Sequence, residues 1–180
     1  MDFSLEKYIE EKERIYNEDE AIYLANYKEL NKKYNIIFDY YLGDELGIPK
    51  NRIIIFDKGK DNLITIDDDN SIEKHTISSE DLNSIKESIN KNNYIFTDGK
   101  VALAPILDGT THTINVMSDN KFNSIETFNL WYWYFEKDVM KTDASEEEKK
   151  YTKSIIDLID DIEEVLEKYN VYIQLDYDEE

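Results

Sequence analysis

The chain has 180 residues, no cysteine, and 41 acidic against 21 basic residues, which gives a formal net charge of −20. The length suffices for one domain with a sizeable core, and an aromatic content of 13% is typical of a folded chain rather than a disordered acidic one. The composition excludes disulfides, thiolate catalysis and metal sites built on cysteine, and the charge argues against direct binding to nucleic acid or to an anionic membrane.

The sequence also suggests a compartment. No run approaches the roughly 18 apolar residues of a membrane-spanning helix, and the first residues lack the basic and apolar regions of a secretory signal. Only two of the 21 basic residues are arginine, while Ile, Asn and Lys are frequent, as in proteins of AT-rich genomes. We therefore expect a cytoplasmic protein of a bacterium, or of a phage-infected cell.

The first predicted element is helical and spans about residues 4–34, where apolar residues recur three or four apart. Asn17, Asp19 and Glu20 are compatible with a break near the middle, so one long helix and a helix pair both remain open. The next segment, residues 36–42, could extend this helix or form a strand.

A meander is predicted after that segment. Residues 52–57 and 62–67 are β-rich and flank a short turn at Gly59, which is a hairpin pattern, and residues 71–77 alternate as a third strand. A helix should follow, with Ser78 or Ser79 as N-cap and Asp81 or Leu82 three residues later. Ser78 with Asp81 approximates a capping box, although Asp replaces the usual Glu or Gln.

The second half of the chain alternates between short strands and one long helix. Residues 94–97, 101–105 and 111–116 are predicted strands, and residues 122–135 begin as a strand and could turn helical near Trp131. A helix from about Ser145 to Tyr169 has its apolar stripe at spacings of 4, 3, 4 and 3 residues. Residues 171–177 could form a last strand, and residues 176–180 form an acidic tail.

Together these elements predict a fold class. We expect a single α+β domain over residues 1–180, with an antiparallel sheet of about 5–7 strands. An N-terminal helix or helix pair, a central helix and an acidic C-terminal helix should pack against this sheet.

Asp108 and His112 are the candidates for a small-molecule pocket. They flank an Asp-Gly turn, and an aspartate can orient a histidine that acts as a general base. However, no nucleophile motif accompanies them, and an Asp-Gly pair before an alternating strand is a common turn pattern. We therefore favour a partly buried structural role for His112 beside Ile114.

No pattern predicts a metal, a cofactor or a catalytic residue. Residues 67–73 offer alternating oxygens but lack the glycine and the distal glutamate of a calcium loop. The five glycines are scattered outside any phosphate-binding motif.

The aromatic segment permits two interpretations. In an extended chain Trp131 and Trp133 would share one face, and Tyr132 and Tyr134 the other. Core packing is the simpler interpretation, and the alternative is a partner-binding anchor formed by Trp131 and Trp133, since tryptophan is favoured at binding hot spots.

The C-terminal charge is the most unusual feature, since residues 154–180 hold ten acids and one lysine. A solvated helix face would explain it, but acidic pairs at i,i+4 destabilise a helix by about 0.2–0.5 kcal/mol each, and a solubility face more often intersperses lysines. The candidate partner-binding acids are Asp157, Asp160, Asp161, Glu163, Glu164 and Glu167.

These observations lead to one functional hypothesis and three alternatives. We expect a non-enzymatic acidic protein that neutralises a basic partner such as a nuclease or toxin, as an immunity protein or antitoxin does. A phage-encoded DNA mimic that inhibits a bacterial defence effector would use the same surface. An enzyme or ligand-binding protein using Asp108 and His112, and a homodimer formed through the aromatic segment, are the other possibilities.

Overall fold

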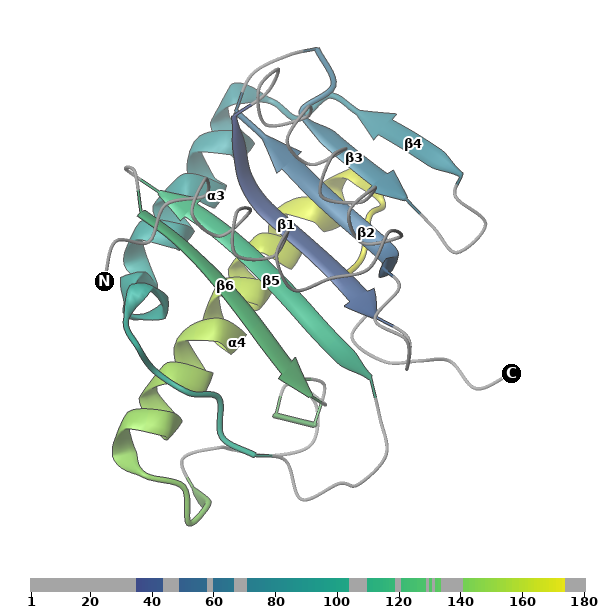
Figure 1. Cartoon of the computed structure of the whole chain (residues 1–180). Helices are drawn as coiled ribbons and strands as arrows, with labels where there is room; N and C mark the ends of the chain where they lie inside the picture. Colours follow the sequence, from purple (N-terminus) through teal and green to yellow (C-terminus); the bar gives the residue numbers. More distant parts are fainter. Residues whose placement is uncertain are drawn as a thin grey trace.

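The described part of the chain forms one open antiparallel sheet with two long helices on one of its faces (Figure 1). In this computed structural model the described residues are 35–43, 49–57, 60–66, 71–103, 110–118, 121–128, 130, 132–133 and 141–173. The strands are β1 (Ile36–Gly43), β2 (Pro49–Phe56), β3 (Leu63–Ile66), β4 (Ile72–His75), β5 (Thr111–Ser118) and β6 (Lys121–Phe128). Their order across the sheet is β4-β3-β2-β1-β5-β6. The predicted α+β class with an antiparallel sheet is confirmed.

The predicted meander forms one half of the sheet. β2, β3 and β4 pair in sequence, with Ile54 opposite Ile64 and Thr65 opposite Glu73. The other half is the hairpin of β5 and β6, which confirms the strands expected at residues 111–116 and at the start of 122–135.

The central strand β1 joins the two halves, because it pairs with β2 on one side and β5 on the other. Seven of its eight residues are buried, so its side chains show no alternation of apolar and polar character. A strand covered on both faces has this pattern, and a buried helix segment can share it. The structure settles the open choice for residues 36–42 in favour of a strand.

Helices α3 (Ser79–Lys91) and α4 (Glu146–Leu166) pack side by side on the sheet, and their buried stripes form the main core together with one face of the sheet. Ser78 caps α3 by accepting from the Asp81 N–H, which decides between the two predicted N-caps, Ser78 and Ser79. Ser145 begins α4 with a capping box to Glu148, so two of the otherwise unpaired N-terminal amides are satisfied.

Two predicted strands are wrong. Asn93–Phe96 forms a 3₁₀ helix, η1, in place of the strand expected at 94–97, and residues 101–103 lie in no strand. In η1 the Thr97 N–H and hydroxyl both donate to the Tyr94 carbonyl. The Ala102 N–H donates to Thr152 Oγ1 of α4 at 2.7 Å. In both places the backbone is thus held by hydrogen bonds within the turn or to a side chain, and not by pairing with a neighbouring strand.

The C-terminal end also differs from the expected strand in its described part. A second 3₁₀ helix, η4 (Glu167–Tyr169), extends α4, and Asn170 then adopts a left-handed conformation with φ 55°. The Val171 N–H returns to the Leu166 carbonyl, so residues 171–173 terminate the helix rather than join the sheet. The N-terminal segment 1–34, residues 174–177 and the acidic tail 176–180 lie outside the described residues.

The face of the sheet away from α3 and α4 carries a buried ion pair. Arg52 of β2 donates from Nε and Nη2 to the two oxygens of Asp39 on β1, at 2.8 and 3.0 Å. Asn115 of β5 donates to the same carboxylate, and Ile54 and Phe122 are buried on this face. The network joins the three neighbouring strands β1, β2 and β5. Its hydrogen bonds also offset the cost of burying the two charges, because a buried charge is tolerated only when it is paired and hydrogen-bonded.

Candidate functional site

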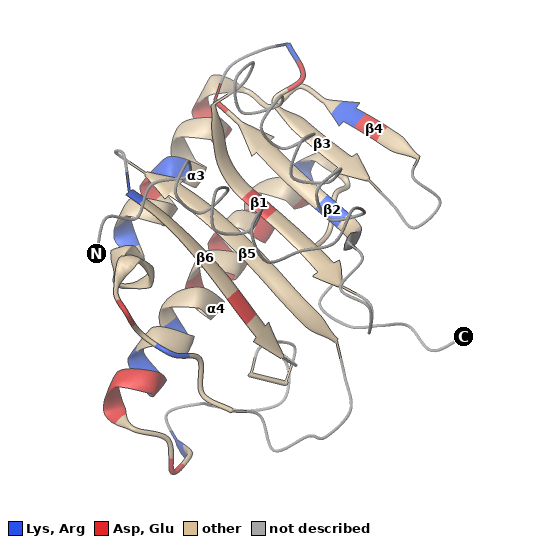
Figure 2. Ribbon diagram, viewed as in Figure 1, with Lys and Arg blue, Asp and Glu red and all other residues tan. Residues whose placement is uncertain are grey.

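The acidic surface of α4 is a single row on the side of the helix away from the core. Asp157, Asp160, Glu164 and Glu167 follow one another at spacings of 3, 4 and 3 residues, and the last three are exposed. We call these four residues the acidic row. At 1.5 Å per residue the row is about 15 Å long. In Figure 2 red segments recur along the C-terminal half of α4, while its blue segments lie nearer its N-terminal end.

Two of the six predicted acids lie outside this row. Asp161 faces α3, where Lys91 Nζ is 2.9 Å and Asn92 Nδ2 is 3.3 Å from its Oδ2. The hydrogen bond to Asp161 raises the pKa of Lys91. Glu163 is half-buried on the opposite flank of the helix, close enough for its charge to act on Tyr40. The structure therefore assigns Asp161 to helix packing and separates Glu163 from the outward surface.

The row carries a lower linear charge density than one nucleic-acid strand. Its carboxylates follow one another at about 5 Å along the helix axis on average, whereas each strand of duplex DNA carries one phosphate per roughly 3.4 Å. Lys153 pairs with Asp157 at 2.7 Å, and Lys168 is turned away to Asp81 of α3 at 2.6 Å. Glu164 and Glu167 make no ion pair with any residue that the structure describes.

Trp133 lies inside the fold. Its indole N–H donates to the Ala102 carbonyl at 2.8 Å, and its side chain is 4% exposed. It packs with Ala102 and the half-buried Ile156 of α4. This burial favours core packing for Trp133, while Trp131 lies outside the described residues.

His112 is fully enclosed on the helix-facing side of β5. Its Nδ1 is 3.1 Å from the Tyr40 hydroxyl, and its Nε2 is 3.1 Å from Thr110 Oγ1. Burial lowers the pKa of His112 to about 4 and raises that of Tyr40. Both ring nitrogens are thus engaged within the fold, which is the geometry of a structural histidine. Asp108 lies outside the described residues, so the predicted Asp–His pair stays a prediction.

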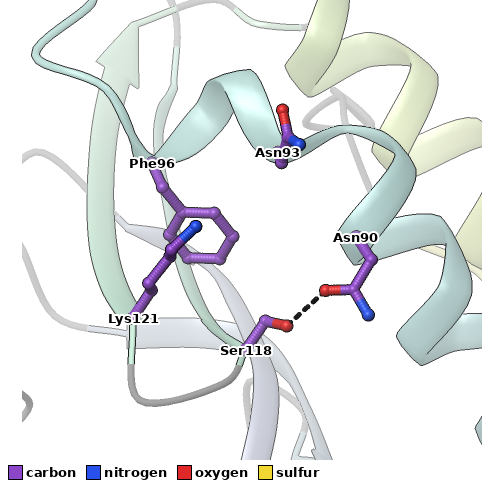
Figure 3. A pocket seen from close by; sticks show the side chains of 5 residues that line it. All are labelled: Asn90, Asn93, Phe96, Ser118 and Lys121. Carbon is purple, nitrogen blue, oxygen red and sulfur yellow. Dashed lines mark hydrogen bonds between the residues drawn. The ribbon is translucent and has the colours of Figure 1, made fainter.

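A small hollow of about 220 Å³ opens at the end of α3, between η1 and the β5–β6 hairpin (Figure 3). Its lining comes from four elements and consists of Asn90, Asn93, Phe96, Ser118 and Lys121. Ser118 Oγ donates to Asn90 Oδ1 at 2.5 Å, and Lys121 Nζ lies 5.9 Å from the centre of the Phe96 ring. No motif in the sequence pointed to these residues, because they are brought together only by the packing of η1 against β6.

Comparison with protein-family models gave no match, and comparison with curated proteins gave none either. Within the described ranges no three His, Asp or Glu side chains are grouped so as to hold a metal ion. None of the helices in those ranges is long and apolar enough to cross a membrane.

Proposed function

We propose that this protein is a non-enzymatic acidic binding protein that inhibits or neutralises a basic, nucleic-acid-acting protein. The observation that carries the proposal is the acidic row on α4, in which Asp157 and three exposed acids follow one another at about 4.5–6 Å along the helix axis. A face that served solubility alone would more often carry lysines between its acids.

The mechanism would be electrostatic. A net charge of −20 attracts a basic partner over long range and speeds its association. At close range, carboxylates spaced about 4.5–6 Å apart along the axis can each accept hydrogen bonds from lysine or arginine side chains that normally meet phosphates. The partner's nucleic-acid site would then be occupied, and the row would act as a competitor of its substrate.

Two biological settings fit this mechanism. In one, the protein is an immunity protein or antitoxin that neutralises a nuclease or another basic toxin. In the other, it is a phage-encoded mimic of DNA that blocks a defence effector of the host. The position of His112, with both nitrogens engaged and no exposed surface, gives no support to the enzyme alternative.

The test is a capture experiment with three forms of the full chain. The row variant changes Asp160, Glu164 and Glu167 to lysine, and the matched control makes the same change at the exposed acids Glu73, Asp98 and Asp143 on other elements. Both variants shift the net charge by the same amount. Wild type and the control should capture a basic nucleic-acid-acting protein from native cells and displace a DNA or RNA oligonucleotide from it.

The row variant should fail in both steps while keeping the wild-type urea midpoint. Equal displacement by the row variant and wild type would reject the acidic row as the binding surface. If both variants lost capture and displacement equally, binding would depend on net charge alone, and this result would also contradict the proposal.

A further inference from the structure

The hollow beside η1 contains Lys121, which like Lys74 and Lys150 has no carboxylate partner among the described residues, but which alone of these lines a hollow of the described structure. Lys86, Lys91, Lys149, Lys153 and Lys168 each have a carboxylate oxygen at 3.0 Å or less. Lys121 has no such partner among the described residues, although the chain has 41 acids for 21 bases. Its ammonium is exposed and lies over the Phe96 ring, a weak contact that leaves all three N–H donors available.

The other polar groups of the hollow include donors as well as acceptors. Because Asn90 Oδ1 accepts from Ser118, the remaining capacity of that carboxamide is its Nδ2 group. Asn93 is exposed, and its side chain makes no hydrogen bond within the described part of the chain. Figure 3 shows the Lys121 amino group in front of the Phe96 ring, with Ser118 and Asn90 across the hollow.

We propose that this hollow binds a monocarboxylate that has an apolar or aromatic body. The carboxylate would accept a charge-assisted hydrogen bond from Lys121 and further bonds from the carboxamide of Asn90 or Asn93. The body would lie along the half-buried Phe96 ring. One lysine matches one negative charge, whereas a doubly charged phosphate would bring an unmatched charge towards a protein of net charge −20.

This inference is independent of the acidic row, since the lining residues belong to α3, η1, β5 and β6 and none to α4. The same carboxylate chemistry can come from a free small acid or from the C-terminus of a peptide. Experiments with both kinds of probe separate these sources.

The test is a titration of the full chain followed by NMR, with benzoate, its neutral isostere benzamide, and inorganic phosphate as probes. A second pair of probes is a short peptide ending in phenylalanine with a free carboxyl group and the same peptide amidated. Benzoate should shift the side-chain signals of Asn90, Asn93 and Lys121, and the amidated peptide and benzamide should leave them unchanged. If the free-acid peptide binds more tightly than benzoate, the C-terminus of a peptide is the source of the carboxylate. If benzoate binds more tightly, the source is a small acid.

Lys121→Gln should weaken benzoate binding by about tenfold or more, as expected for the loss of a charge-assisted hydrogen bond. The matched control Lys74→Gln, at an exposed lysine of β4, should leave it unchanged. Phe96→Leu should weaken benzoate more than acetate. Equal binding of benzamide and benzoate, equal binding of phosphate, or unaltered binding by the Lys121 variant would each overturn the proposal.

Discussion

His112 and Tyr40 illustrate how single polar side chains are accommodated in the core. Burial raises the pKa of Tyr40, so its hydroxyl keeps its proton and can donate it to His112 Nδ1. The Nε2 proton of the neutral imidazole is then directed to Thr110 Oγ1. A protonated imidazole would have to place a charge in a site with no exposed surface, and this cost is the reason for the lowered pKa of His112.

The first prediction concerns the pH dependence of stability. The folded pKa of His112, about 4, lies below its ordinary value of 6.5, so the unfolded chain binds this proton more readily. The stabilising contribution of neutral His112 is complete above pH 6.5 and is lost as the pH falls towards 4. At 1.36 kcal/mol per pKa unit, the loss amounts to about 3 kcal/mol.

The measurement compares urea unfolding of wild type and His112→Gln from pH 7 to pH 4. The variant should be less stable at pH 7 because it loses the Tyr40 contact, and its disadvantage should shrink as the pH falls. A constant difference across this range, or an NMR titration of His112 near pH 6.5, would contradict the assignment.

The second prediction concerns Gly99, which lies against the ring of the buried Tyr151. A Cβ added at Gly99 would come within 2.0 Å of Tyr151 Cδ2, far inside van der Waals contact. Gly99→Ala should therefore force the ring or the loop to move and cost about 1–3 kcal/mol of unfolding free energy, as overpacking in a core does. Chemical denaturation measures this cost, and a change below about 0.5 kcal/mol, the usual range for an uninvolved surface site, would show that the contact is not maintained.

At the scale of elements, α4 combines a strong helix start with an unfavourable charge pattern. The capping box of Ser145 and Glu148 and the acids of its first turn favour helix formation. Its last turn contains no basic residue, and Asp160 and Glu164 repel each other at i,i+4. The helix is held to α3 by Lys91–Asp161 and by Lys168–Asp81, and the pKa of Asp81 is lowered to about 2 by hydrogen bonds from Lys168, Tyr169 and Ser78.

The third prediction tests this helix start. Ser145→Ala removes the side-chain acceptor of the Glu148 N–H and should destabilise the fold by about 1 kcal/mol. Ser154→Ala, in the interior of the same helix, is the matched control and should change stability by less than about 0.5 kcal/mol. Equal effects of both substitutions on urea unfolding would show that the cap contributes nothing beyond a serine side chain.

The elements with clear periodicity or clear turn residues could be predicted from the sequence. The hairpin of the meander belongs to this group because its β-rich runs flank a turn at Gly59, and α3 and α4 belong to it because burial on one face imposes an apolar stripe on a helix. β1 could not be assigned, since it is buried on both faces. Residues 94–97 and 101–103 were wrongly predicted as strands, because their β-rich sequence is held by hydrogen bonds with Tyr94, Thr152 and Trp133 and not by pairing with another strand.

The candidate site was predictable to a lesser degree. The helical period placed Asp160, Glu164 and Glu167 on one surface, but it could not reveal that Lys91 and Asn92 engage Asp161. That information depends on the packing of α3 beside α4. The hollow at Lys121 depends in the same way on the contact between η1 and β6.

At the scale of the whole molecule, basic and acidic residues differ in where they are used. Several lysines form ion pairs that connect different parts of the fold, as in Lys86–Asp57, Lys91–Asp161 and Lys168–Asp81. The excess of acids therefore remains on outward surfaces, including the acidic row of α4. Such an excess acts mainly on the rate at which a basic partner arrives. Because exposed charges are screened beyond a Debye length of about 8 Å at physiological salt, this effect weakens as the salt concentration rises.

The most direct test of the acidic row is the association rate constant for the captured basic partner, measured for wild type, the row variant and the matched control at several salt concentrations. Wild type and control should associate rapidly and slow steeply as salt rises from about 50 to 500 mM, whereas the row variant should be at least about tenfold slower at low salt with a shallower dependence. Identical rates and identical salt dependence for the row variant and wild type would contradict the account.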